Sequence, residues 1–279
     1  MLLRLVAIGL LAILVCASDA IALSETARDK NNLIGPVRTV TTKARGLLQT
    51  ETYDLAGRLT DAAIYQEHFN ISTSYVFTYD QHGKLREEIA YDAARTLIYR
   101  KLFAYAHDSA GRETAVVAAT QDGEFHHAEF SIYDKSGNLS EMALLNGIET
   151  YRTVFDVLGR LIYSGRFRDG QLVGELQHTY DTSGHLIDII SYSPDGAVTG
   201  RSASEYDDSG HRIRITTETF QSGVASRWVT TYEYDHRGNW IKELTSKETN
   251  TSPQTEPAPS PTMQERVIEY HRIPDVKAP

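Results

Sequence analysis

The chain has 279 residues, which is enough for one large domain or a short array of repeats. Hydrophobic residues make up 41% and charged residues 23%, a balance that is typical of globular proteins and excludes a wholly disordered chain. The formal net charge of -9 repels polyphosphate, so we expect no nucleic acid among its partners.

Residues 1–22 are predicted to be a secretory signal peptide. Arg4 precedes an uncharged apolar run over 5–17, which is short for a bilayer span and suits the hydrophobic part of a signal. Small residues favour cleavage after Ala20 or Ala22. We therefore expect an exported protein in the periplasm, at the cell surface or outside the cell, with no stable membrane span after cleavage.

The chain has a single cysteine, Cys16, and it lies within the predicted signal. The mature protein is therefore expected to contain no thiol and no disulfide, so its stability depends on packing. A lipid anchor on Cys16 is the alternative interpretation. The bulky Val15 argues against it, because lipoprotein signals resemble one another in having a small residue before the modified cysteine.

The first strand after the signal is predicted over 35–44. Val37, Thr39 and Thr41 share one parity there, which is typical of a strand with one face turned to a core. We expect this entry strand to pair with the hairpin that follows and to cap the domain.

A five-residue motif, an aromatic ring followed by Asp-x-x-Gly, then recurs eight times at intervals of 22 to 28 residues. The ring is Tyr in six copies, His107 in the third and Phe155 in the fifth. The aspartate and the glycine are present in every copy: Asp54 and Gly57, Asp80 and Gly83, Asp108 and Gly111, Asp134 and Gly137, Asp156 and Gly159, Asp181 and Gly184, Asp207 and Gly210, Asp235 and Gly238.

Each copy is predicted to be a turn between two strands. An aspartate at the start of a type I turn accepts hydrogen bonds from the backbone N–H groups ahead of it, and a glycine at the fourth position takes the positive φ that closes a hairpin with a bulge. The residue two after the glycine is apolar in six of the eight copies and is expected to face the same side as the ring.

A second turn signal follows the third to seventh motifs by about 10 to 13 residues. The first two units have Glu67 to Asn70 and Asp92 to Arg95 in its place. Each repeat is therefore predicted to be strand, turn, strand, turn. The later second turns are Asp122-Gly123, Asn146-Gly147, Asp169-Gly170, Asp195-Gly196 and Ser222-Gly223.

The repeats end before a Pro-rich stretch over 245–263, whose composition predicts a flexible loop inside the domain. Residues 264–273 then alternate like a strand and are expected to pair with the strand that begins at Trp240. The fold class that follows is all-β, with a repeat domain over 33–244. We expect its antiparallel hairpins to form a curled, elongated sheet or a short β-solenoid.

The motif resembles the YD repeat of bacterial Rhs proteins and animal teneurins, over roughly residues 53–240. The resemblance implies hairpins wound into a curled sheet or hollow shell, in a short exported member of the family. The Asp-Pro-x-Gly boundary that precedes the toxin domain of large Rhs proteins is missing, so a toxin role is not implied. Eight repeats are expected to be too few for a closed shell.

The motif aspartates could be calcium ligands, but one aspartate per repeat does not supply the 6–8 oxygens that calcium needs, so we interpret them as turn formers. The adjacent His126 and His127 are expected to point to opposite faces of a strand, which argues against a shared transition metal. No nucleophile motif or phosphate loop is present in the sequence. We therefore predict no cofactor, no metal and no catalytic residue.

The tyrosines and tryptophans could stack on sugars if one sheet face is open, or form the core if it is packed. The leading hypothesis is a non-enzymatic exported protein whose β surface binds a glycan or an envelope protein. Two alternatives stay open: a carbohydrate-active enzyme with an Asp/Glu pair on the concave face, and a structural component of an envelope assembly.

Overall fold

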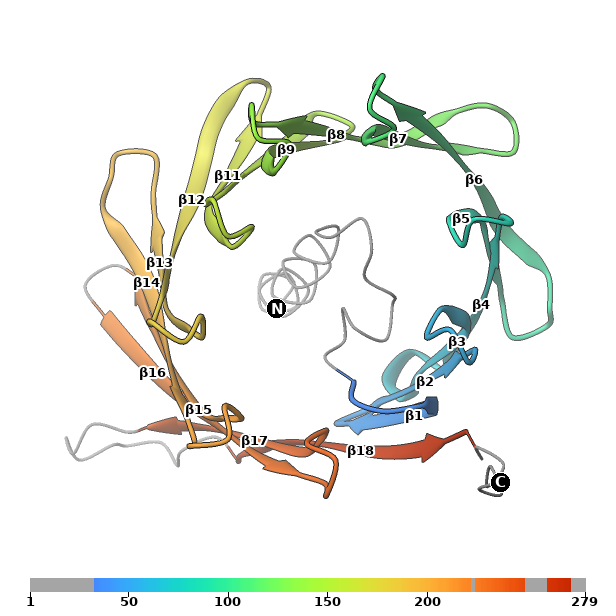
Figure 1. Cartoon of the computed structure of the whole chain (residues 1–279). Helices are drawn as coiled ribbons and strands as arrows, with labels where there is room; N and C mark the ends of the chain where they lie inside the picture. Colours follow the sequence, from blue (N-terminus) through green and yellow to red (C-terminus); the bar gives the residue numbers. More distant parts are fainter. Residues whose placement is uncertain (1–32, 222–223, 249–259, 272–279) are drawn as a thin grey trace, which may run out of the picture.

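Eighteen strands form one antiparallel sheet whose two edges join, so the computed structural model is a closed barrel (Figure 1). It describes residues 33–221, 224–248 and 260–271. A short 3-10 helix, η2 (Glu67–Phe69), follows β3. The strands are β1 (Val37–Ala44), β2 (Leu47–Tyr53), β3 (Leu59–Gln66), β4 (Ile71–Tyr79), β5 (Leu85–Tyr91), β6 (Leu97–His107), β7 (Glu113–Thr120), β8 (Phe125–Tyr133), β9 (Leu139–Asn146), β10 (Glu149–Phe155), β11 (Leu161–Arg168), β12 (Gln171–Tyr180), β13 (Leu186–Tyr192), β14 (Val198–Tyr206), β15 (Arg212–Gln221), β16 (Val224–Tyr234), β17 (Trp240–Glu248) and β18 (Thr262–Tyr270).

The all-β prediction is confirmed, but the open curled sheet or short solenoid is wrong. Strand β1 pairs with β2, as expected of the entry strand, and it also pairs with β18, where Val40 lies opposite Ile268. The entry and closing strands raise the total to 18, so each strand needs to turn by only about 20° for the sheet to close. Closure removes both free edges, which would otherwise expose unpaired backbone groups.

The closing strand pairs with β17 as expected and adds the second pairing with β1. Both strands extend into the region predicted as a loop, because β17 continues to Glu248 and β18 begins at Thr262. Three sequence predictions lie outside the described residues: the signal with Cys16, the Ser222-Gly223 turn, and the middle of the Pro-rich stretch. No helix in the described ranges is long and apolar enough to cross a membrane.

The inner face of the wall is identified by the segment that leads into β1, which lies on the inner side of the barrel in Figure 1. Leu33 of this segment packs with Val37, Val40 and Tyr53, so these three side chains point into the lumen. Side chains alternate along a strand, and residues directly opposite each other share a face. The register of the paired strands therefore extends the assignment of inner and outer side chains from strand to strand around the barrel.

The two ends of the barrel carry different turns. The eight motif corners follow the even-numbered strands and so lie at one end, where the turns curl toward the barrel axis in Figure 1. The hairpins that follow odd-numbered strands lie at the other end, and several of them flare outward. We call these the motif end and the opposite end.

The apolar core is small and lies at the seam where β1 meets β2 and β18. Its buried members are Leu33, Val37, Val40 and Tyr53, with Ile268 packed against them. An 18-stranded barrel is too wide for side chains to fill its interior. Most of the wall is accordingly half-buried, with both faces open to solvent.

The lumen wall and its motif corners as the candidate functional site

The motif corners share one geometry, seen at Asp134. Its carboxylate oxygen Oδ1 accepts the N–H groups of Ser136 at 2.8 Å and Asn138 at 2.9 Å, while its carbonyl accepts the N–H of Gly137 at 3.0 Å. Gly137 has φ of 89°, and all eight motif glycines have positive φ. The aspartate thus uses its lone pairs within its own turn.

The turn also explains the titration of these carboxylates. The N–H of Asn138 and that of Ser136 lower the pKa of Asp134 below its ordinary value, because both bind the charged form. A carboxylate occupied in this way is a poor cation ligand. Within the described ranges, no group of three or more His, Cys, Asp or Glu side chains is placed to hold a metal.

The ring of each motif lies directly opposite the residue two after its glycine, as in the pair Tyr180 and Leu186. Rings and their partners therefore share the lumen side. The eight pairs are Tyr53 and Leu59, Tyr79 and Leu85, His107 and Glu113, Tyr133 and Leu139, Phe155 and Leu161, Tyr180 and Leu186, Tyr206 and Arg212, and Tyr234 and Trp240.

A second function of the rings was missed by the sequence analysis: six tyrosines each tie a hairpin to the one before it. The hydroxyl of Tyr180 donates to the carbonyl of Leu161 at 2.9 Å, and its ring lies under the guanidinium of Arg160 at 4.9 Å. Tyr79, Tyr105, Tyr133, Tyr206 and Tyr234 donate to the equivalent carbonyls at 2.6 to 2.9 Å. Tyr105 replaces the motif residue His107 in this contact.

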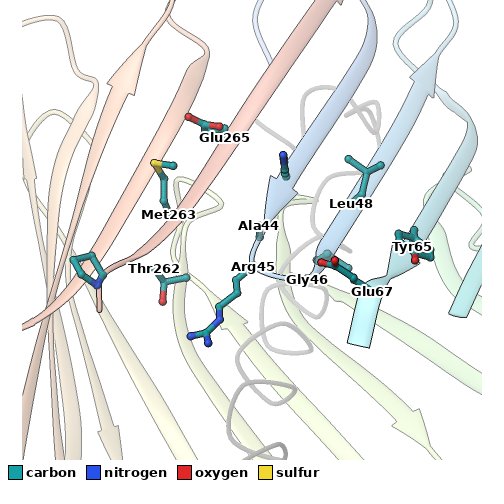
Figure 2. A pocket seen from close by; sticks show the side chains of 12 residues that line it. Ala44, Arg45, Gly46, Leu48, Tyr65, Glu67, Thr262, Met263 and Glu265 are labelled. Carbon is teal, nitrogen blue, oxygen red and sulfur yellow. The ribbon is translucent and has the colours of Figure 1, made fainter. Parts of the chain in front are cut away.

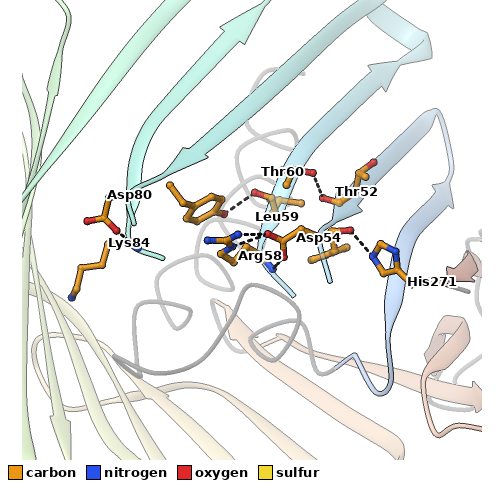
Figure 3. A network of polar contacts seen from close by, with 10 residues as sticks. Thr52, Asp54, Arg58, Leu59, Thr60, Asp80, Lys84 and His271 are labelled. Atoms are coloured by element: carbon orange, nitrogen blue, oxygen red, sulfur yellow. Dashed lines mark hydrogen bonds and ion pairs between the residues drawn. The ribbon is translucent and has the colours of Figure 1, made fainter. Parts of the chain in front are cut away.

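We call the contacts that join successive hairpins the ladder. The side chain that lies over each ring of the ladder comes from the position after the motif glycine. The arginines at this position also pair with their own motif aspartates, as Arg58 pairs with Asp54 at 2.7 Å (Figure 3), and Arg58 lies over Tyr79. The ammonium of Lys84 pairs with Glu113 instead. This position holds an arginine, lysine, histidine or asparagine in every copy, a regularity from which the ladder could have been predicted. Its residues are Arg58, Lys84, Arg112, Asn138, Arg160, His185, His211 and Asn239.

The seam uses the same positions differently. Asn239 is 1% exposed and binds the backbone of Ile34 twice, through Oδ1 to its N–H at 2.5 Å and through Nδ2 to its carbonyl at 3.0 Å. Tyr270 donates to Asp235 at 2.6 Å and accepts from Asn239. Burial, together with the hydrogen bond to Asp235, raises the pKa of Tyr270 to about 12. The last motif corner thus anchors both the entry segment and the closing strand.

The prediction that His126 and His127 point to opposite faces is wrong. A bulge between Ala118 and Ala119 leaves His126 as the extra residue of β8, and the two Nδ1 atoms lie 2.9 Å apart. Burial lowers the pKa of both rings, and the positive charge of Lys101 adds to this. The short contact between the two Nδ1 atoms is a hydrogen bond whose donor depends on the tautomers of the rings, and the nearby Lys101 disfavours a bound metal cation.

The charged side chains of the lumen are divided by sign. Strands β2 to β8 contribute Glu51, Glu88, Glu113 and Glu129, with Lys101 among them. Strands β11 to β18 contribute mainly cations, namely Arg166, Arg168, Arg212, Lys247 and Arg266, with Glu243 among them. The lumen therefore has an acidic half and a basic half.

One network sits where the halves meet. Glu149 of β10 accepts from Arg166 at 2.5 Å and from Arg168 at 2.6 Å, and Tyr151 also donates to it. These hydrogen bonds lower the pKa of Glu149 to about 2. Both arginines therefore donate to the same carboxylate.

A shallow groove of 660 Å³ lies at the opposite end, between the β1–β2 turn, β3 and the start of β18 (Figure 2). Leu48, Tyr65 and Met263 give it an apolar floor. Its charged residues are Lys43, Arg45, Glu67 and Glu265, and of these Lys43 and Glu265 lie directly opposite each other in the sheet. The groove therefore offers an apolar surface without converging reactive groups.

No family model matches the chain, and no curated protein matches it in sequence. Among solved structures it is similar to a porin-like protein from Bacteroides uniformis, with 13% identity and a TM-score of 0.46 over 85% of this chain and 99% of that one. It is also similar to TcdB2-TccC3-TEV, with 15% identity and a TM-score of 0.34 over 72% of this chain and 14% of that one. The chain thus spans a small part of the second protein. At this level, neither similarity says what the chain does.

Proposed function

We propose that this protein is an exported, hollow YD-repeat shell that binds a guest in its lumen and catalyses no reaction. The observation that carries the proposal is the closed wall, whose inner face bears aromatic rings beside charged groups. Such a face suits a glycan, because sugar rings pack on aromatic rings while their polar groups find hydrogen-bond partners. An envelope protein segment is the alternative guest.

Membership of the YD-repeat family is part of the proposal. It is supported by eight corners that share an aspartate, a positive-φ glycine and a ring directed at the lumen. The ladder between successive hairpins adds a physical reason for the repeat, because it uses a ring and the side chain after the motif glycine at repeating positions of most units.

The outer wall supports a barrel surrounded by water. Side chains on the outer face form ion pairs between neighbouring strands, such as Glu141 with Arg152 at 2.7 Å and Asp188 with Arg201 at 2.8 Å. A charged residue on the lipid face of a membrane barrel costs roughly 2–4 kcal/mol near the bilayer centre. We therefore place the protein in an aqueous compartment after export.

A carbohydrate-active enzyme remains the second candidate, because Glu243 has a feature of a general acid. Burial raises its pKa above the ordinary value, although Arg212 and Arg266 oppose the shift. A hydrolase would lose activity in Glu243→Gln while its fold is retained. Absence of turnover in a broad glycan panel, with binding intact, is the expected result.

The lumen can be tested with cysteine labelling, since the only cysteine lies in the predicted signal. Thr73 and Ser74 are neighbours on β4, and the register places Thr73 in the lumen and Ser74 outside. In Thr73→Cys, a glycan guest should slow reaction with a small maleimide, whereas Ser74→Cys should react at an unchanged rate. Equal rates with every glycan and envelope extract would refute a guest in the lumen and favour a purely structural role.

A further inference from the structure

Both tryptophans of the chain lie in the basic half of the lumen. Trp228 on β16 and Trp240 on β17 share the inner face with Tyr232, whose ring is 6.3 Å from that of Trp240 at 67°. Arg266 on β18 and Glu243 on β17 belong to the same face through the register. Four neighbouring strands, β15 to β18, thus build one patch near the seam.

Each ring of this patch carries a cation on its face. The guanidinium carbon of Arg266 lies 3.5 Å from the centre of the Trp240 ring, and that of Arg212 lies 5.3 Å from the centre of Tyr232. The ammonium of Lys247 lies 5.9 Å from Trp228. The patch therefore presents positive charge and aromatic surface side by side.

Three guanidinium nitrogens of this patch lack acceptors, although Arg212 also has a hydrogen bond with the hydroxyl of Tyr232. Nε and Nη1 of Arg266 and Nε of Arg212 are buried and have no hydrogen-bond partner in the described part of the chain. This contrasts with Arg166 and Arg168, which share the carboxylate of Glu149. A buried N–H group without an acceptor is destabilising, so the patch lacks hydrogen-bond acceptors that would stabilise it.

The nearby acidic groups Glu51 and Glu243 do not fully compensate the burial of Arg266. Burial lowers the pKa of Arg266 to about 10 although both carboxylates oppose the shift, and burial raises the pKa of Glu243 although Arg212 and Arg266 oppose it. Within the described residues, no ion pair within 4.0 Å joins Glu243 to Arg266. An additional anion would lower the free energy of the patch.

We infer that the patch of Arg212, Trp228, Tyr232, Trp240, Lys247 and Arg266 binds a short acidic oligosaccharide, with a sugar carboxylate near the guanidiniums and the sugar ring against the aromatic rings. The inference rests on the proposed lumen function and specifies the guest. A carboxylate matches the planar donors of arginine. The acidic half of the lumen, which includes Glu51, Glu88 and Glu129, repels a long polyanion, so a guest of few units is favoured over nucleic acid.

The tryptophans themselves report on this site. Trigalacturonate is titrated into the mature protein while tryptophan fluorescence is followed, with the fully methyl-esterified trisaccharide as an uncharged control. We expect a saturable change with the acid and at least tenfold weaker binding of the ester. Trp228→Phe and Trp240→Phe should each retain part of the signal, because each leaves one reporter in the patch.

Variants distinguish binding at the patch from binding elsewhere in the lumen. Arg266→Gln is expected to weaken binding at least tenfold, and Lys247→Gln severalfold, whereas Arg166→Gln, in the network of Glu149, should change it less than twofold. Circular dichroism checks that each variant is folded. Should Arg266→Gln fail to fold, Lys247→Gln and Arg212→Gln carry the same comparison.

Three results would overturn the inference and leave the lumen function intact: equal binding of acid and ester, tighter binding of a single-stranded oligonucleotide, or unchanged binding in the folded arginine and lysine variants. Absence of any binding of the acid overturns it too. Protection of Thr73→Cys by other glycans then shows that only the guest was misassigned. Absence of that protection with every guest removes the proposed function as well.

Discussion

The two ends of the barrel reverse the chain in different ways. At the motif end, each corner repeats the same aspartate and glycine, and tyrosine hydroxyls such as that of Tyr206 join successive hairpins. At the opposite end, neighbouring turns are joined by isolated backbone hydrogen bonds, such as that from Glu67 to Gly46 at 2.9 Å. The difference teaches that the motif couples hairpins to one another as well as turning the chain.

The largest expected effect is at the seam, where a motif residue joins distant parts of the chain. Asn239→Ala should lower the free energy of unfolding by about 2–4 kcal/mol, because it leaves the buried backbone groups of Ile34 without partners. Chemical denaturation measures the loss. Asn138→Ala is the matched control, since Asn138 holds the same motif position in an exposed corner, and it should cost under about 0.5 kcal/mol. Equal losses would mean that Asn239 does not close the barrel.

A motif glycine comes next. Gly137→Val should cost about 1–3 kcal/mol, because a branched side chain is forced to φ of 89°. The added Cβ would also lie 3.3 Å from Arg112 of the preceding corner. Lys135→Ala, in the same turn, should change the unfolding midpoint very little. A similar loss in both variants would contradict the turn geometry.

The ladder itself is tested by removing one hydroxyl. Tyr180→Phe should cost about 1 kcal/mol, because the carbonyl of Leu161 loses its donor while the ring keeps its contact with Arg160. Tyr65→Phe is the control at the opposite end, where the hydroxyl is only 3.4 Å from Asn70 and exposed. We expect no measurable loss there. A loss of the same size at Tyr65 would show that the hydroxyls do not distinguish the two ends.

The corners could be predicted from sequence because the physics is local: an aspartate and a glycine within five residues decide the turn. Closure could not, because it depends on Ile34 meeting Asn239, which is 205 residues away, and no periodic pattern marks that contact. The basic half of the lumen could not be predicted from the sequence either. Its recognition needs the register of each strand, and bulges such as the one at His126 change which side a residue faces.

A ninth corner turns the chain as the motif does but does not couple hairpins, so it distinguishes the two roles of the motif. Tyr91-Asp92-Ala93-Ala94-Arg95, at the opposite end, repeats the motif with arginine in place of glycine. Asp92 accepts the N–H groups of Ala94 at 2.9 Å and Thr96 at 2.8 Å, so the turn is the same. Tyr91 faces the outer wall, because it lies opposite Ser74, so its ring lies outside the lumen ladder.

A substitution in this corner has the smallest expected effect, and it is the only one expected to raise the free energy of unfolding. Arg95 has φ of 65°, a left-handed conformation that costs a side chain roughly 1 kcal/mol. Arg95→Gly should therefore raise the free energy of unfolding by about 0.5–1 kcal/mol, the glycine's greater freedom in the unfolded chain offsetting part of the gain. Arg95→Ala, which keeps the strain, is the control and should give no gain. Stabilisation by both variants would point to the arginine side chain instead of the backbone. A gain confined to glycine would show that this turn obeys the motif's local rule without the contacts that join hairpins at the other end.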